Sequence, residues 1–184
     1  MVATPSTMVP LGTTAPAFEL AEPDGTTWTF DRIAGQRGTL VAFVCNHCPY
    51  VRLIAPRLGA LAARWRQQGL GVVGINPNPD RADEAPEHMS AYASAWRWTF
   101  PYVIDTEQTA ARDYHAACTP DFFLYDAARR LVYRGRFDAA RPGNGVPVTG
   151  DELDAAVGSV LAGEEIEIGQ LPSIGCSIKW KDRP

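Results

Sequence analysis

The fold is decided by the stretch from Val41 to Val51, which reads Val-Ala-Phe-Val-Cys-Asn-His-Cys-Pro-Tyr-Val. Its first half, together with Leu40, is a short apolar run of the kind found in buried strands. After the second cysteine the apolar residues recur at intervals of three and four, as in an amphipathic helix: Val51, Ile54, Leu58, Leu61 and Trp65. The pattern predicts a strand over residues 40–44 and a helix over residues 48–68, with two cysteines where one becomes the other.

This position favours a reactive dithiol. The first turn of a helix has unpaired backbone N–H groups and the positive end of the helix dipole, and both stabilise a thiolate. We expect Cys45, on the exposed side of the turn, to be the attacking thiolate and Cys48 to be the resolving thiol. Pro49 suits the first helical turn, where its missing N–H costs nothing.

A zinc site or a structural disulfide would account for the cysteine pair less well. A closed zinc site needs two further ligands, yet Cys118 and Cys176 are far apart in the sequence and the histidines do not form a tight pair. A purely structural disulfide across so small a loop would stabilise little. The strand-turn-helix context favours the redox interpretation.

The composition indicates one globular domain over residues 1–184, with 46% hydrophobic and 21% charged residues. Residues 1–14 are expected to form a flexible arm and residues 164–184 an irregular tail. The net charge of −4 and the lack of a basic block argue against a nucleic-acid partner. No secretory signal or long apolar run is recognisable, so we expect a cytoplasmic protein that does not enter a membrane.

Further along the chain, strand and helix patterns alternate and then give way to a strand pair and a last helix. Residues 17–20 and 26–30 flank the turn tripeptide Pro23-Asp24-Gly25, which predicts an N-terminal β-hairpin. Apolar residues 70–75 predict a second buried strand, residues 122–125 and 131–137 a hairpin, and residues 150–161 a final helix. This order predicts an α/β fold with a mixed central sheet flanked by helices.

Three segments of the sequence resemble the thioredoxin-like superfamily, in its redoxin or AhpC/TSA (peroxiredoxin-like) branch. They are residues 41–51 with the C-x-x-C motif, residues 12–20 followed by Asp24-Gly25, and residues 117–124, which contain Thr119-Pro120. The resemblance implies a cis peptide at Thr119-Pro120 beside the two cysteines. It also implies that the backbone edge of Thr119 binds an extended substrate next to Cys45.

The sequence also departs from its relatives in this superfamily. Peroxiredoxins have a threonine three residues before the peroxide-attacking cysteine, where this chain has Ala42 before Cys45 and Cys45 before Cys48. The departure weakens a peroxidase role. Thioredoxins proper have a tryptophan just before the first cysteine and a buried acid six residues before it; here these positions are Val44 and Thr39. No buried proton acceptor for Cys48 is recognisable in the sequence.

Asn46 and His47, between the two cysteines, are expected to tune the redox couple, since a cationic His47 would stabilise the reduced form. Alternatively, His47 is only an exposed polar residue at a helix start. Cys118 is expected near the site or in the core below it, as a small apolar residue. Cys176 is either a third redox thiol that attacks Cys45 or an exposed bystander, and the second interpretation is favoured.

The sequence thus predicts a thiol-disulfide oxidoreductase that uses a Cys45/Cys48 dithiol-disulfide couple, supported by Asn46, His47 and Pro49. Its partners would be a protein or small-molecule disulfide or a peroxide, and an external dithiol reductant. No organic cofactor or metal is expected. Two alternatives stay open: a peroxiredoxin-type thiol peroxidase, and a non-catalytic metal-binding or redox-sensing module in which Cys45, Cys48 and His47 hold a soft metal such as Cu(I).

Overall fold

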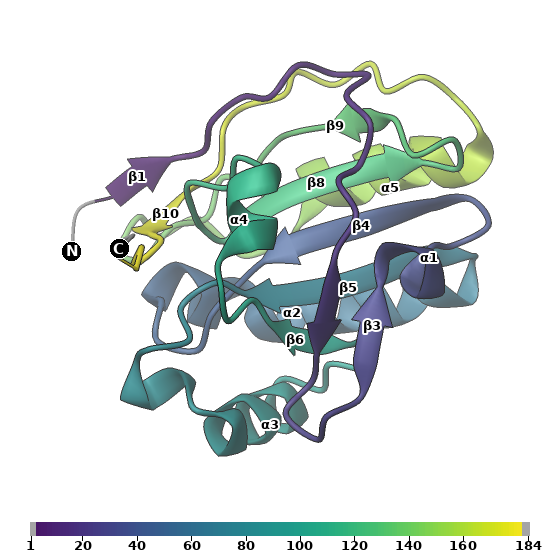
Figure 1. Cartoon of the computed structure of the whole chain (residues 1–184). Coiled ribbons are helices and arrows are strands. Elements are labelled where there is room, and N and C mark those ends of the chain that lie inside the picture. Colours follow the sequence, from purple (N-terminus) through teal and green to yellow (C-terminus); the bar gives the residue numbers. More distant parts are fainter. Residues whose placement is uncertain (1–2, 182–184) are drawn as a thin grey trace.

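A seven-stranded mixed sheet forms the centre of the computed structural model, which describes residues 3–181 (Figure 1). The strand order is β3-β2-β6-β5-β4-β8-β9. The strands are β2 (Glu19–Ala21), β3 (Thr27–Thr29), β4 (Gly38–Phe43), β5 (Leu70–Asn76), β6 (Tyr102–Ile104), β8 (Asp121–Asp126) and β9 (Leu131–Tyr133). The helices are α1 (Phe30–Ile33), α2 (Pro49–Gln67), η1 (Ala82–Glu84), α3 (Pro86–Ala95), α4 (Thr109–Asp113) and α5 (Asp151–Ala162).

The predicted mixed sheet and N-terminal hairpin are confirmed. Strand β4 pairs in parallel with β5 and antiparallel with β8, and β2 pairs antiparallel with β3. Every residue of β4 and β5 is buried, which explains why both read as continuous apolar runs in the sequence. These two strands form the centre of the sheet and fix the position of the loop that follows β4.

Helices cover both faces of the sheet, and β4 contributes alternate side chains to each face (Figure 1). Leu40 and Ala42 pack in the cluster that includes residues of α2 and α5. Val41 and Phe43 pack in the cluster that includes residues of α1 and α4. The start of α2 is therefore held directly against the carboxyl end of β4.

A second, three-stranded sheet is formed by β1 (Ala3–Pro5), β10 (Ile174–Ser177) and β7 (Cys118–Thr119), in the order β1-β10-β7. The two ends of the described chain lie side by side there, at the end of the molecule towards which β4 points (Figure 1). The prediction of an arm without structure and an irregular tail is therefore wrong for these strands. Both segments are short and have no clear hydrophobic period, so only long-range pairing makes them strands.

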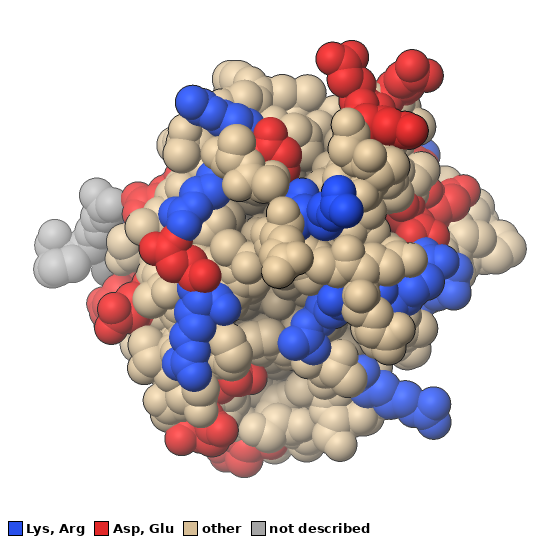
Figure 2. Space-filling model, turned by 90° about the vertical axis from the view of Figure 1, so that its right-hand side faces the viewer, with Lys and Arg blue, Asp and Glu red and all other residues tan. Residues whose placement is uncertain are grey.

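The surface on the opposite side of the molecule mixes positive and negative side chains without a large patch of one sign (Figure 2). Within residues 3–181, no helix combines the length and the apolar character that a membrane crossing requires.

Candidate active site

The C-x-x-C loop joins β4 to α2, as the sequence predicts. Cys48 is the N-cap of α2 and Pro49 is its first residue, so Cys48 lies at the positive end of the longest helix of the described chain. All four cysteines of the chain are thiols in this structure.

Thr119, at the end of β7 and shortly before β8, lies against the C-x-x-C loop. The peptide bond between Thr119 and Pro120 is cis, as the sequence resemblance implies. The hydroxyl of Thr119 lies 3.1 Å from Cys45 Sγ, and Cys48 Sγ lies 3.0 Å from the Thr119 carbonyl oxygen. One residue therefore contacts both sulfurs.

Two expectations about access to the site are wrong. Cys45 was expected on the exposed side of the turn, but both Cys45 and Cys48 have 0% of their surface exposed. The backbone edge of Thr119 was expected to be open to a substrate, but Thr119 is buried and pairs with Cys176 of β10. For Thr119 and Cys48 the physical reason is the C-terminal strand, because β10 pairs with Thr119 and places Cys176 against Cys48. A substrate can reach the buried Cys45 only after part of the surrounding structure moves.

Cys45 and Cys48 shift each other's pKa in opposite directions. Burial raises the pKa of Cys45 well above its ordinary value, and the nearby Cys48 and Glu84 raise it further. The hydrogen bond from Cys45 lowers the pKa of Cys48 to about 5, and contributions from Cys176 and the Val51 backbone act in the same direction. Groups this close titrate as a unit. The structure therefore defines one negative charge held by the sulfur pair, with Cys48 as its main carrier.

Glu84 of η1 is the residue that sequence reasoning missed. Its side chain is almost fully buried, and its two carboxylate oxygens accept hydrogen bonds from the backbone N–H groups of Asn46 and His47, both at 2.7 Å. The side chain of Asn76 donates to the same carboxylate at 2.8 Å. Glu84 thus fixes the backbone between the cysteines and places a carboxylate beside Cys45. In the sequence, Glu84 is recognisable only as an acidic residue in an irregular segment after the second buried strand.

Asn46 and His47 both face inwards. Asn46 is fully buried and accepts a hydrogen bond from the hydroxyl of Tyr102 at 3.0 Å, while Arg52 Nε donates to its carbonyl at 2.6 Å. His47 Nδ1 lies 2.5 Å from Glu84, and the His47 side chain is only 6% exposed. The alternative of an exposed polar histidine is therefore wrong, whereas its effect on the redox couple stays a prediction.

Among residues 3–181, one group of side chains has the spacing of a metal site, and it combines two residues of the loop with one residue of η1. Ligand atoms of Cys45, His47 and Glu84 all lie within 4.8 Å of one another. The set fits a metal poorly, because both oxygens of Glu84 are already bonded to N–H groups of the protein. It also differs from the expected Cys45, Cys48 and His47 set.

The two remaining cysteines lie near the dithiol but differ in their contacts. Cys118 is buried, and its sulfur lies 3.5 Å from the carbonyl oxygen of Pro120. Burial raises its pKa, which agrees with a small apolar residue. Cys176 is 1% exposed, and its sulfur lies 2.9 Å from Cys48 Sγ. The favoured interpretation of Cys176 as an exposed bystander is wrong.

The mixed sheet, the C-x-x-C loop at the start of α2 and the cis proline beside it define a thioredoxin-like redoxin. The chain belongs to the AhpC/TSA family, whose profile matches residues 11–134. Two solved structures are similar over almost the whole chain. They are a hypothetical protein of Sinorhizobium meliloti 1021 (48% identity, 97% of this chain and 98% of that chain, TM-score 0.94) and an uncharacterized conserved protein of Geobacillus kaustophilus (41%, 100% and 99%, TM-score 0.96).

More distant relatives have named activities. The thiol-disulfide oxidoreductase ResA of Geobacillus thermodenitrificans is 26% identical over 123 residues, which cover 67% of each chain. A putative thiol:disulfide interchange protein DsbE of Chlorobium tepidum shares the fold, with a TM-score of 0.66 at 18% identity over 84% of this chain and 99% of that chain. The matched family region ends before β10, so Cys176 lies outside it.

Proposed function

We propose that this protein is a thiol-disulfide oxidoreductase that uses Cys45 and Cys48 as its dithiol-disulfide couple. The observation that carries the proposal is the contact of Thr119 with both sulfurs at the N-terminus of α2. The similarity to ResA supports the same reaction class. The substrate is a protein or small-molecule disulfide, and an external dithiol restores the pair.

The geometry around Thr119 suits the form in which Cys48 holds the proton and Cys45 is the thiolate. When the proton is on Cys48, that thiol donates to the Thr119 carbonyl oxygen, and the Thr119 hydroxyl donates to a Cys45 thiolate. Cys45 then attacks the substrate disulfide, forms a mixed disulfide and releases one substrate thiolate. Cys48, which has the low pKa, loses its proton and attacks Cys45, which releases the second substrate thiol and forms Cys45–Cys48.

We expect Cys45→Ser to abolish the reduction of insulin disulfides by dithiothreitol, because the mixed disulfide can no longer form. Cys48→Ser should lose turnover as well but accumulate a mixed disulfide on Cys45, which mass spectrometry of the non-reduced protein detects. Cys118→Ser is the matched control, since Cys118 is equally buried and has no sulfur contact with the couple. Wild-type turnover by Cys45→Ser would rule the proposal out.

A peroxidase is the second candidate function, and one observation favours it. The chain lacks the threonine that precedes the peroxide-attacking cysteine of peroxiredoxins, yet the fold places the Thr119 hydroxyl 3.1 Å from Cys45 Sγ. That hydroxyl is available to orient a peroxide. Stopped-flow oxidation of the reduced protein by hydrogen peroxide tests this, and Thr119→Val should then react more slowly. A wild-type rate equal to that of free cysteine removes the candidate.

The cellular location proposed from the sequence is the cytoplasm, and fractionation of cells that express the full chain measures it.

A further inference from the structure

Cys176 lies against the dithiol although 128 sequence positions separate it from Cys48. The two sulfurs are 2.9 Å apart, and an approach of about 0.9 Å would bring them to the usual bond length of about 2.05 Å. Cys48 thus interacts with two other thiols, because Cys45 of the same loop also lowers its pKa. Cys118, in the neighbouring strand, has no such contact and bonds to a carbonyl oxygen instead.

The strand that contains Cys176 is held in this position from several sides. β10 pairs with β1 on one edge and with β7 on the other, in a register that sets Cys176 opposite Thr119. Gly175 permits this approach, because a Cβ atom there would collide with the Thr119 carbonyl oxygen. The glycine is therefore required by the same packing that directs Cys176 towards Cys48.

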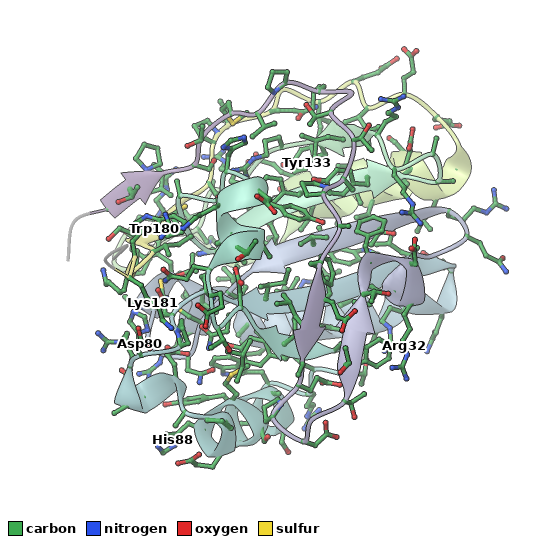
Figure 3. The ribbon with its side chains drawn as sticks, in the orientation of Figure 1. Arg32, Asp80, His88, Tyr133, Trp180 and Lys181 are labelled. Carbon is green, nitrogen blue, oxygen red and sulfur yellow. The ribbon has the colours of Figure 1, made fainter. Side chains whose placement is uncertain are left out.

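The residues after β10 bind the chain to the loop that follows β5. Lys179 N–H donates to Asn78 Oδ1 at 2.7 Å, and Gln108 donates to the Lys179 carbonyl at 2.8 Å. Lys181 Nζ lies 3.5 Å from Asp80, and Figure 3 shows these two side chains next to each other at the edge of the molecule. We call residues 178–181, with these contacts, the C-terminal latch. It holds Cys176 at a defined distance from Cys48.

We infer that Cys176 is a third redox thiol, which exchanges with the oxidised couple to form a Cys48–Cys176 disulfide. The inference rests on the proposed function, which supplies the Cys45–Cys48 disulfide. In the exchange, Cys176 Sγ bonds to Cys48 Sγ, the Cys45–Cys48 bond breaks, and its electron pair stays on Cys45. The proton that leaves Cys176 ends on Cys45, so the step is redox-neutral and regenerates a Cys45 thiol.

The exchange gives the chain two oxidised forms with different properties. In the first, the disulfide joins Cys45 to Cys48 within the loop between β4 and α2. In the second, a covalent bond fastens β10 to the start of α2 and leaves Cys45 as the reduced sulfur. The sequence suggests Cys176 as a redox thiol only through attack on Cys45, whereas the structure places its sulfur against Cys48.

Disulfide mapping of the full chain tests the inference, because trypsin separates the relevant cysteines. Cys45 and Cys48 lie on residues 38–52, Cys118 on residues 113–129 and Cys176 on residues 137–179. The reduced protein is oxidised with oxidised glutathione, blocked with N-ethylmaleimide, digested and analysed by mass spectrometry without reduction. We expect residues 38–52 joined to residues 137–179, with one alkylated cysteine on the first peptide.

Variants assign the bond and separate the two proposals. Cys48→Ala and Cys176→Ala should lose the cross-link, and Cys118→Ala should leave it unchanged. The inference is overturned if residues 38–52 become oxidised while Cys176 is recovered fully alkylated, or if the cross-link survives in Cys48→Ala. The proposed function fails by a different result, namely wild-type insulin reduction by Cys45→Ser, whatever the cross-link does.

Discussion

At the scale of single residues, Thr119 and Glu84 decide what the two cysteines can do. The Thr119 hydroxyl can donate to a Cys45 thiolate, whereas its carbonyl oxygen accepts only from a protonated Cys48, so Thr119 favours the proton on Cys48 and the charge on Cys45. Glu84 adds a negative charge that raises the pKa of Cys45 and thereby favours charge on Cys48. The reduced couple is therefore poised as one thiol and one thiolate.

This arrangement predicts a single thiolate over a wide pH range. Ultraviolet absorbance of the reduced protein should show one thiolate forming as the pH rises through about 5, because the hydrogen bond from Cys45 lowers the pKa of Cys48. No second thiolate should form below pH 9, since the pKa values of Cys45, Cys118 and Cys176 are all raised. Cys48→Ser should remove the transition.

The cause of the low pKa can be tested separately. Cys45→Ala deletes the donor and should raise the pKa of Cys48, whereas Cys45→Ser keeps a donor and should change it less. A transition near the ordinary cysteine pKa of 9.0 in the wild-type protein would contradict this account of the site.

At the scale of elements, the short helix η1 fixes the redox loop through one carboxylate. Glu84 accepts from the backbone N–H groups of Asn46 and His47 and from the side chain of Asn76, and all of these donors lie in or near the buried site. Asp83, the preceding residue, is 42% exposed and its carboxylate pairs with Arg81 at the surface. Of these two adjacent acidic residues, Glu84 should therefore contribute much to the free energy of unfolding and Asp83 little.

We expect Glu84→Ala to lower the free energy of unfolding by about 3 kcal/mol, because it leaves several buried donors without an acceptor. Asp83→Ala is the matched control and should cost less than about 1 kcal/mol, as is usual for an exposed ion pair. Urea denaturation at neutral pH measures both. Equal effects of the two substitutions would show that Glu84 does not hold the loop.

The sequence predicted what depends on local pattern and missed what depends on distant contacts. The strand over residues 40–44, the helix that follows it and the cis proline follow from periodicity and from a recognisable motif. Glu84 and Cys176 could not be found this way, because each reaches the site from an irregular or short segment placed by long-range pairing. The packing of β10 against Thr119 and Cys48 was missed for the same reason, since this strand has no hydrophobic period of its own.

At the scale of the whole molecule, the two ends of the described part of the chain pair with each other beside the active site. β1 and β10 extend the small sheet over β7, and the C-terminal latch ties this cover to the loop after β5 and to Gln108 beside α4. Because Cys45 and Cys48 are 0% exposed, reaction with a substrate requires a local opening of the protein. The free energy of that opening should set the rate at which the thiols react.

A substitution at Gln108 tests whether the C-terminal latch limits access to the thiols, and it leaves the cysteines unchanged. Its side chain donates to the Lys179 carbonyl and accepts from the Lys181 N–H at 2.7 Å, and it also donates to Pro77 at 2.7 Å. Gln108→Ala removes these bonds, and two latch bonds of about 1 kcal/mol each would correspond to roughly a thirtyfold easier opening. Alkylation of the reduced protein by iodoacetamide should accelerate by about that factor.

Glu107→Ala is the control, since Glu107 is the exposed neighbour of Gln108 and should leave the alkylation rate unchanged. Global stability has to be measured alongside, because only opening of the cover should change the rate while most of the unfolding free energy is retained. If Gln108→Ala alkylates at the wild-type rate, the latch does not limit access. The thiols would then become accessible through movement of the loop between β4 and α2, which η1 holds.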